Sequence, residues 1–205
     1  MALIISAIPL IHYPFGWFET FFHELSHGLA ALLTGGIIHS IELNLDGSGY
    51  CVTSGGVQFL VLISGYAGSA LWGCLVYLSV TSGKARSANI IAAMLAALVT
   101  LTGVLWARDL VTILILLAIV GLFAAAYRYG SRQLTRRFVE FIGVYVVLDA
   151  IRSPFSLIDG QSLGDGSALT DMTYIPEIIW IMLWSLMAIS CLVLLWIRSA
   201  PNEFT

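Results

Sequence analysis

Long apolar stretches separated by short polar ones run along most of the chain. After a first helical region, apolar runs cover residues 57–80, 88–106, 110–127, 138–151 and 174–197. About 20 consecutive apolar residues suffice to cross the hydrocarbon core of a bilayer as a helix. The pattern therefore predicts an all-α polytopic membrane protein with about six transmembrane helices, among which the run 138–151 is the shortest.

The first helical region extends from near the N-terminus to about residue 33. Pro9 and Pro14 restrict helix geometry and predict interruptions there, and Thr34-Gly35-Gly36 predicts the helix end. The first dozen residues lack the basic segment and the small-residue cleavage site of a secretory signal. We therefore expect them to begin the mature chain.

Residues 37–56 change to a period of two. Apolar side chains alternate here with polar ones, namely Ile41, Leu43 and Leu45 with Ser40, Glu42 and Asn44. The turn sequence Asp-Gly-Ser-Gly at 46–49 follows, so a short membrane-associated β-hairpin is predicted after the first helix. An unpaired strand edge cannot face lipid. The hairpin is either a simple connection or an edge that binds an extended peptide by strand addition, and the sequence leaves both open.

Composition supports a membrane location. Of the 205 residues, 59% are hydrophobic and 10% are charged, whereas soluble domains carry about 25% charged residues. We expect one integral membrane domain over residues 1–205. The net charge of -3, without a basic patch interleaved with aromatic residues, excludes a nucleic-acid partner. The scattered Cys51, Cys74 and Cys191 are typical of small packing residues rather than of a disulfide framework.

The basic residues are distributed unevenly between the two sides of the predicted spans. Six spans place seven of the nine on one side: Lys84, Arg86, Arg128, Arg132, Arg136, Arg137 and Arg198. Arg108 and Arg152 fall on the other side. Because cytoplasmic loops carry an excess of basic residues, both termini are predicted to be cytoplasmic. The hairpin and the segment 153–173 then face outward.

The candidate chemistry lies in FFHELSHGLAALLTGG at residues 21–36, which contains the H-E-x-x-H pattern of zinc metallopeptidases. On a helix, His23 and His27 are one turn apart on the same face and can converge on one ion. Glu24 lies beside them, where it can take a proton from a water molecule. In a soluble protein such a pair could be a solvated helix face. In a membrane, ionisable groups are costly, and this favours a functional site.

Catalytic zinc usually needs a third protein ligand. Asp165 lies in the outward loop before the last span, and Asp149 lies near the end of the fifth span. Asp165 could instead cap a helix, and Asp149 could pair with Arg152. His12 and His39 have no partner at ligand spacing. The residues alone leave the third ligand open.

The motif helix, the hairpin and a late aspartate together resemble the site-2 protease family of intramembrane zinc metallopeptidases, and most closely its small bacterial branch. The resemblance implies zinc held by His23, His27 and a later aspartate, with Glu24 as the catalytic acid and base. The sequence LGDGSALTDMTYIPEIIW resembles the late S-D-A-type motif of that branch, which selects Asp165. The family resemblance also implies that the protein lies in a bacterial inner membrane. Gly-Asp-Gly departs from the family's L-D-G pattern, and the charge bias places the site outside, whereas family members place it toward the cytosol.

The leading hypothesis is a zinc-dependent intramembrane endopeptidase in which Glu24 activates a zinc-bound water. Its expected partners are the lipid bilayer, a membrane-spanning or membrane-associated protein substrate and a possible membrane subunit. The alternative is a non-proteolytic membrane subunit or scaffold that retains the metal site. A small transporter fits six spans, but it predicts internal repeats and ionisable residues in several helices, which the sequence lacks.

Overall fold

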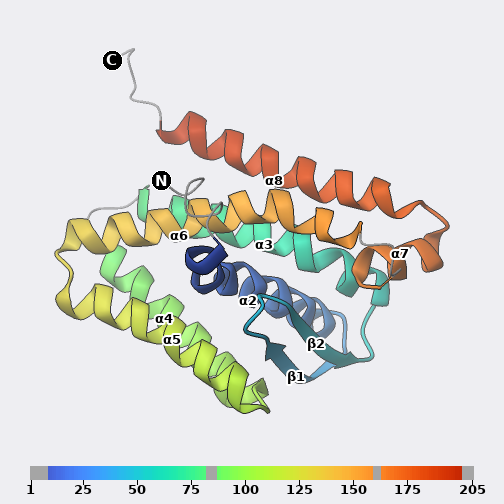
Figure 1. Cartoon of the computed structure of the whole chain (residues 1–205), viewed down its shortest axis with the longest axis horizontal. Coiled ribbons are helices and arrows are strands. Elements are labelled where there is room, and N and C mark those ends of the chain that lie inside the picture. Colours follow the sequence, from blue (N-terminus) through green and yellow to red (C-terminus); the bar gives the residue numbers. More distant parts are fainter. Residues whose placement is uncertain (1–8, 82–86, 159–162, 200–205) are drawn as a thin grey trace.

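The computed structural model describes residues 9–81, 87–158 and 163–199. Its elements, shown in Figure 1, are α2 (Pro9–Leu33), β1 (Ile37–Leu43), β2 (Gly49–Ser54), α3 (Gln58–Thr81), α4 (Ser87–Trp106), α5 (Leu110–Tyr129), α6 (Arg132–Arg152), the 3-10 helix η1 (Ser153–Leu157), α7 (Asp165–Thr173) and α8 (Glu177–Ser199). The predicted helical membrane fold with one hairpin after the first helix is confirmed. Lys84 and Arg86, which entered the charge comparison, lie outside the described residues.

Four of the described helices are long and apolar enough to cross a membrane: α3, α4, α5 and α8. The other two predicted spans, α2 and α6, do not meet this criterion because ionisable side chains interrupt them. The count of about six therefore stays a prediction. The predicted interruption at Pro14 is wrong, since α2 continues through this residue.

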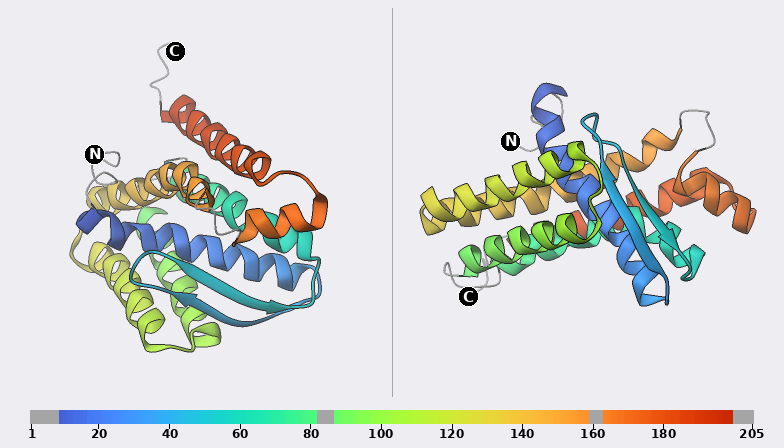
Figure 2. Two further views of the ribbon diagram at one scale, coloured as in Figure 1. Left: turned by 45° about the vertical axis from the view of Figure 1, so that its right-hand side comes forward. Right: turned by 90° about the horizontal axis from the view of Figure 1, so that it is seen from below.

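The motif helix α2 lies at the centre of the arrangement. It packs against α3, which in turn packs along α6, while α4 and α5 form an antiparallel pair on one side and α8 covers α3 and α6 on the other (Figures 1 and 2). Glycines bring α3 and α6 into backbone contact. A Cβ atom on Gly73 would lie only 2.8 Å from the carbonyl oxygen of Gly143, so neither position has room for a side chain.

The hairpin lies along α2 (Figure 2), with its apolar residues Ile38, Ile41 and Leu43 buried. β1 and β2 are antiparallel and form a two-stranded sheet, so β2 has a strand partner on one edge only among the described residues. The hairpin is the element that brings a free strand edge to the motif helix.

Side-chain hydrogen bonds fix the hairpin to two different helices. Thr20 of α2 donates its hydroxyl proton to the carbonyl oxygen of Gly47 in the turn, at 2.6 Å. At the end of β1, the amide of Leu43 donates to the Thr112 hydroxyl of α5, at 2.8 Å. Asp109 caps α5 by accepting from the amide of Thr112. Both the turn and the β1 side are therefore anchored.

Candidate metal centre

The two motif histidines face each other inside the protein. His23 and His27 project from successive turns of α2, with 3.0 Å between their Nε2 atoms and 4.7 Å between ring centroids. Both side chains are buried. The helical spacing alone accounts for this pairing, because residues four apart lie on one face.

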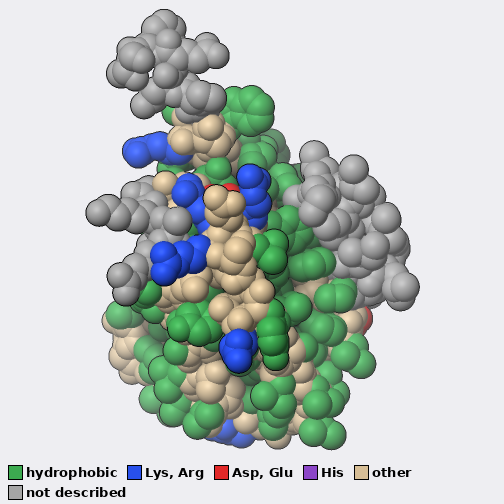
Figure 3. Space-filling model, turned by 90° about the vertical axis from the view of Figure 1, so that its left-hand side faces the viewer, with side chains coloured by type: hydrophobic (Ala, Val, Ile, Leu, Met, Phe, Trp, Pro, Cys, Tyr) green, Lys and Arg blue, Asp and Glu red, His purple; other side chains and the backbone are tan. Residues whose placement is uncertain are grey.

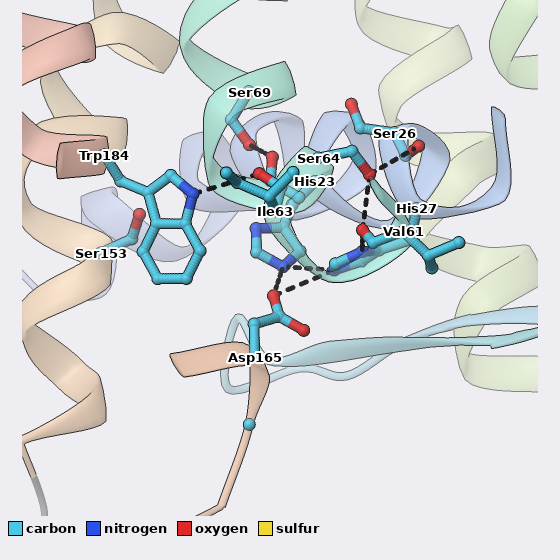
Figure 4. Close-up of polar contacts among 12 residues, drawn as sticks. His23, Ser26, His27, Val61, Ile63, Ser64, Ser69, Ser153, Asp165 and Trp184 are labelled. Atoms are coloured by element: carbon cyan, nitrogen blue, oxygen red, sulfur yellow. Dashed lines mark hydrogen bonds and ion pairs between the residues drawn. The ribbon is translucent and has the colours of Figure 1, made fainter. Parts of the chain in front are cut away.

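Asp165 completes a group of three donors (Figure 4). It is the first residue of α7, and the preceding Gly164 has a φ of +98°, a conformation that favours glycine. Its Oδ2 lies 3.2 Å from Nε2 of His23 and 3.1 Å from Nε2 of His27. Among the described residues, these three are the group of His, Cys, Asp or Glu side chains placed closely enough to share an ion.

The other candidate aspartate lies elsewhere. Asp149 is buried in α6, where its charge acts on that of Glu19 from α2. The residue thus belongs to a different polar cluster from the two imidazoles. The fold therefore places the two candidate aspartates apart. α7 brings Asp165 to His23 and His27 of α2, whereas Asp149 of α6 lies near Glu19, one helical turn before His23.

The spacing and chemistry of the three donors fit zinc. Four ligands at about 2.0 to 2.2 Å in a tetrahedron lie about 3.3 to 3.6 Å from one another. The observed separations of 3.0, 3.1 and 3.2 Å are slightly shorter, so a small outward movement accommodates an ion. Two imidazole nitrogens and one carboxylate oxygen form a typical catalytic set, with a fourth position left for water.

Gly65 of α3 supplies the room beside these donors. A Cβ atom at this position would lie 2.6 Å from Nε2 of His23 and would also clash with Nε2 of His27. No other residue type fits without moving the rings. The sequence analysis did not identify this glycine as part of the site, because nothing in the sequence shows that α3 crosses α2 at the donors.

The two imidazoles are held differently. Nδ1 of His27 lies 2.7 Å from the Val61 carbonyl oxygen, which can only accept, so Nδ1 keeps its proton and Nε2 is the nitrogen that can release its own proton to bind a metal. Nδ1 of His23 is buried and has no hydrogen-bond partner in the part of the chain described. Instead, the His23 ring meets Tyr66 edge-on, with centroids 4.4 Å apart. Tyr66 packs in turn against Trp184 of α8, at 4.8 Å.

Tyr66 and Trp184 are further residues that sequence reasoning missed. The indole Nε1 of Trp184 donates to the Ile63 carbonyl oxygen at 3.1 Å, which fixes α8 to the same turn of α3. Figure 4 shows Trp184 beside the donors. The available signal was an aromatic residue directly after a glycine in an apolar span, which is too common to identify a site.

The electrostatics of Asp165 suit a ligand. Burial raises the pKa of its carboxyl group, but the charge of His27 and hydrogen bonds from both imidazoles outweigh burial and hold the pKa well below its usual range. The carboxylate is therefore anionic at neutral pH.

A cavity of about 640 Å³ opens beside the donors. His23, Glu24 and His27 line one wall, and β2 with the following Gly55 and Gly56 lines another. Glu24 is 4% exposed, and Gly49 of β2 approaches it so closely that a Cβ there would lie 3.0 Å from its Cγ. The cavity thus joins the acidic residue of the motif to the strand whose outer edge is free.

Comparison with known proteins agrees with these features. Residues 1–195 match the family described as Peptidase M50B-like. Searches of curated proteins and of solved structures gave no match. The family match spans the motif helix, the hairpin and Asp165, and four of the described helices are long and apolar enough to cross a membrane. The chain therefore belongs to the Peptidase M50B-like family, and so to the site-2 protease family of membrane peptidases that the motifs predicted.

Proposed function

We propose that this protein is a zinc-dependent intramembrane endopeptidase that hydrolyses peptide bonds of membrane-spanning or membrane-associated proteins. The observation that carries the proposal is the convergence of His23, His27 and Asp165 beside the buried Glu24, in a cavity bordered by a free strand edge. Family membership supports the peptidase class.

In this proposal, Nε2 of His23, Nε2 of His27 and Oδ2 of Asp165 hold the metal. Zinc bound there would polarise the scissile carbonyl group and acidify water. Glu24 accepts a proton from the attacking water on its carboxylate and then donates it to the nitrogen of the leaving amine. Its burial shields this carboxylate from bulk solvent, while the cavity admits the reacting water.

The substrate must be extended at the cleavage point, since an intact helix encloses the peptide bonds that are attacked. The outer edge of β2 offers backbone donors and acceptors to such a segment. Because Gly49 packs against Glu24, a peptide paired along β2 would pass close to the catalytic carboxylate. Of the two hairpin roles, this geometry favours the binding edge.

We further propose a bacterial inner-membrane location with both termini in the cytoplasm. The described arginines Arg128, Arg132, Arg136, Arg137 and Arg198 lie at one end of the helices, near the α5–α6 turn and the end of α8. The donors lie toward the other end, so the cavity would open outward.

The test is cleavage of a single-span substrate by the purified protein, with zinc content measured on the same sample. Glu24→Gln should bind zinc like the wild type and lose at least about 100-fold in cleavage rate, because a proton acceptor is removed and the ligands are kept. Unchanged cleavage by this variant would rule out the mechanism. A wild-type protein that binds zinc and cleaves no substrate would instead support the alternative of a non-proteolytic subunit.

A further inference from the structure

A second cavity lies at the opposite end of the molecule from the metal centre. Its volume is about 580 Å³, and its walls include Asn89, Ile90, Met94 and Ala97 of α4, Tyr127 of α5 and Arg132 of α6. It shares no residue with the cavity beside His23 and His27. α4 begins here and α5 ends here, and both can span a membrane, so the cavity lies at the level of the lipid headgroups.

The polar wall of this cavity holds an exposed cation, Arg132, and a buried acceptor, Oδ1 of Asn89. The guanidinium of Arg132 makes no ion pair or hydrogen bond with another described residue, whereas the nearby Arg136 is paired with Glu140 at 2.8 Å. Oδ1 of Asn89 is buried and has no hydrogen-bond donor among the described residues. Buried polar atoms are rarely left unpaired. A ligand that completes this site would therefore supply an anionic oxygen for Arg132 and a hydroxyl or amine donor for Oδ1 of Asn89.

The remaining wall is apolar and leads away from these groups along α4. Ile90, Met94 and Ala97 follow one face of the helix over about 10 Å, at 1.5 Å per residue. Met94 and Ala97 also line an apolar groove of about 570 Å³ between α3 and α4, which Trp72 and Leu75 close on the other side. A polar pocket at headgroup level therefore continues into an apolar channel at hydrocarbon depth.

We propose that this cavity binds an anionic phospholipid of the phosphatidylglycerol type. Its phosphate would accept from Arg132, a headgroup hydroxyl would donate to Asn89, and an acyl chain would lie along Met94 and Ala97. Basic pockets between transmembrane helices are suited to anionic headgroups. Figure 3 looks onto this end, where several basic side chains lie among hydrophobic ones and strengthen the local positive field. Phosphatidylcholine carries no net negative charge to match this field and has no headgroup donor for Asn89, while phosphatidylethanolamine could donate to Asn89 but also carries no net negative charge.

The proposal concerns lipid selectivity and does not depend on peptidase activity. The measurement is native mass spectrometry of the purified full-length protein after exposure to equal amounts of phosphatidylglycerol and phosphatidylcholine. The wild type should retain phosphatidylglycerol preferentially. Arg132→Gln should weaken its retention about fivefold, the effect of one basic residue near an anionic headgroup. Asn89→Leu should reduce the preference while leaving phosphatidylcholine adducts unchanged.

Arg198→Gln is the matched control, because it removes the same charge at the same end of the bundle and Arg198 is not among the residues lining the cavity. Its phosphatidylglycerol retention should equal that of the wild type. An equal loss in this control would mean that the attraction is diffuse and would overturn the proposal. So would unchanged retention in Arg132→Gln, or complete competition by free glycerol phosphate, which would identify a soluble phosphate ester as the ligand. Arg132→Lys keeps the charge at this site and should restore most of the binding if folding is intact.

Discussion

Replacing Gly65 by alanine is the sharpest test of the metal centre, since it adds one methyl group and removes no proposed ligand. The new Cβ would lie 2.6 Å from Nε2 of His23, and an ordinary contact begins at 3.4 Å. The ring must therefore retreat by 3.4 − 2.6 = 0.8 Å or tilt away. A zinc–nitrogen bond is only about 2.0 to 2.1 Å long, so a shift of this size breaks the coordination geometry.

The expected loss follows from this displacement. Disturbing groups that merely orient a ligand weakens metal affinity about 10- to 100-fold. Moving the ligand atoms themselves should reach at least the upper value, which corresponds to about 2.7 kcal/mol. Helix propensity acts in the opposite direction, since alanine is better than glycine in a helix by roughly 0.5 to 1 kcal/mol. Gly65→Ala should therefore bind zinc at least about 100-fold more weakly without losing secondary structure.

Zinc affinity would be measured by competition with a chromophoric chelator, alongside thermal unfolding with and without zinc. Gly121→Ala is the control, because nothing lies within 4 Å of a Cβ at this position of α5. It should leave zinc affinity unchanged. Wild-type affinity in Gly65→Ala would refute the proposal that these imidazoles bind the ion.

Three further predictions test the surrounding structure. Asp165→Asn should lower zinc content at least about tenfold whereas Asp149→Asn keeps it, as metal analysis of the purified proteins would show; the reverse result would exchange their roles. Tyr66→Leu should weaken zinc binding about tenfold and alter the visible spectrum of the cobalt-substituted protein, and Tyr66→Phe should restore both, because the ring contacts His23; equal effects of the two variants would contradict this. Thr112→Val leaves the amide of Leu43 unpaired and should destabilise the protein by about 1 to 3 kcal/mol in thermal unfolding, with faster hydrogen exchange in the hairpin. Unchanged exchange there would show that this bond does not anchor β1.

The motif helix was predictable because its chemistry depends on local geometry. His23 and His27 face each other for the reason that any residues four apart do, and alternation with a glycine-rich turn sufficed to identify the hairpin. Helix ends were less accessible. α6 begins at Arg132, before the predicted apolar run at 138–151. Ser131 caps the helix there, and a hydropathy pattern does not detect a polar first turn.

The late segment shows where sequence reasoning ran out. Residues 153–173 were expected as an outward loop, but within the described part of this segment residues 153–157 form η1 and residues 165–173 form α7, and α8 starts only at Glu177. Tyr174 has a φ of 61°, and Pro176 precedes the new helix, so the apolar run from residue 174 becomes helical only at Glu177. The choice between Asp165 and Asp149 depended on this tertiary path, as did the meaning of Gly65. Neither the choice of aspartate nor the role of Gly65 can be predicted from the spacing of nearby residues in the sequence.

The anchoring of the hairpin has a consequence for the products of cleavage. Thr112 holds the β1 side and Thr20 holds the turn, so the open edge of β2 is kept in a fixed position beside Glu24. We expect peptides of unrelated sequence to be cut at a constant offset from the residue that docks opposite Gly49. Fragment lengths should then be set by backbone register, and the identity of the side chains at the scissile bond should matter far less.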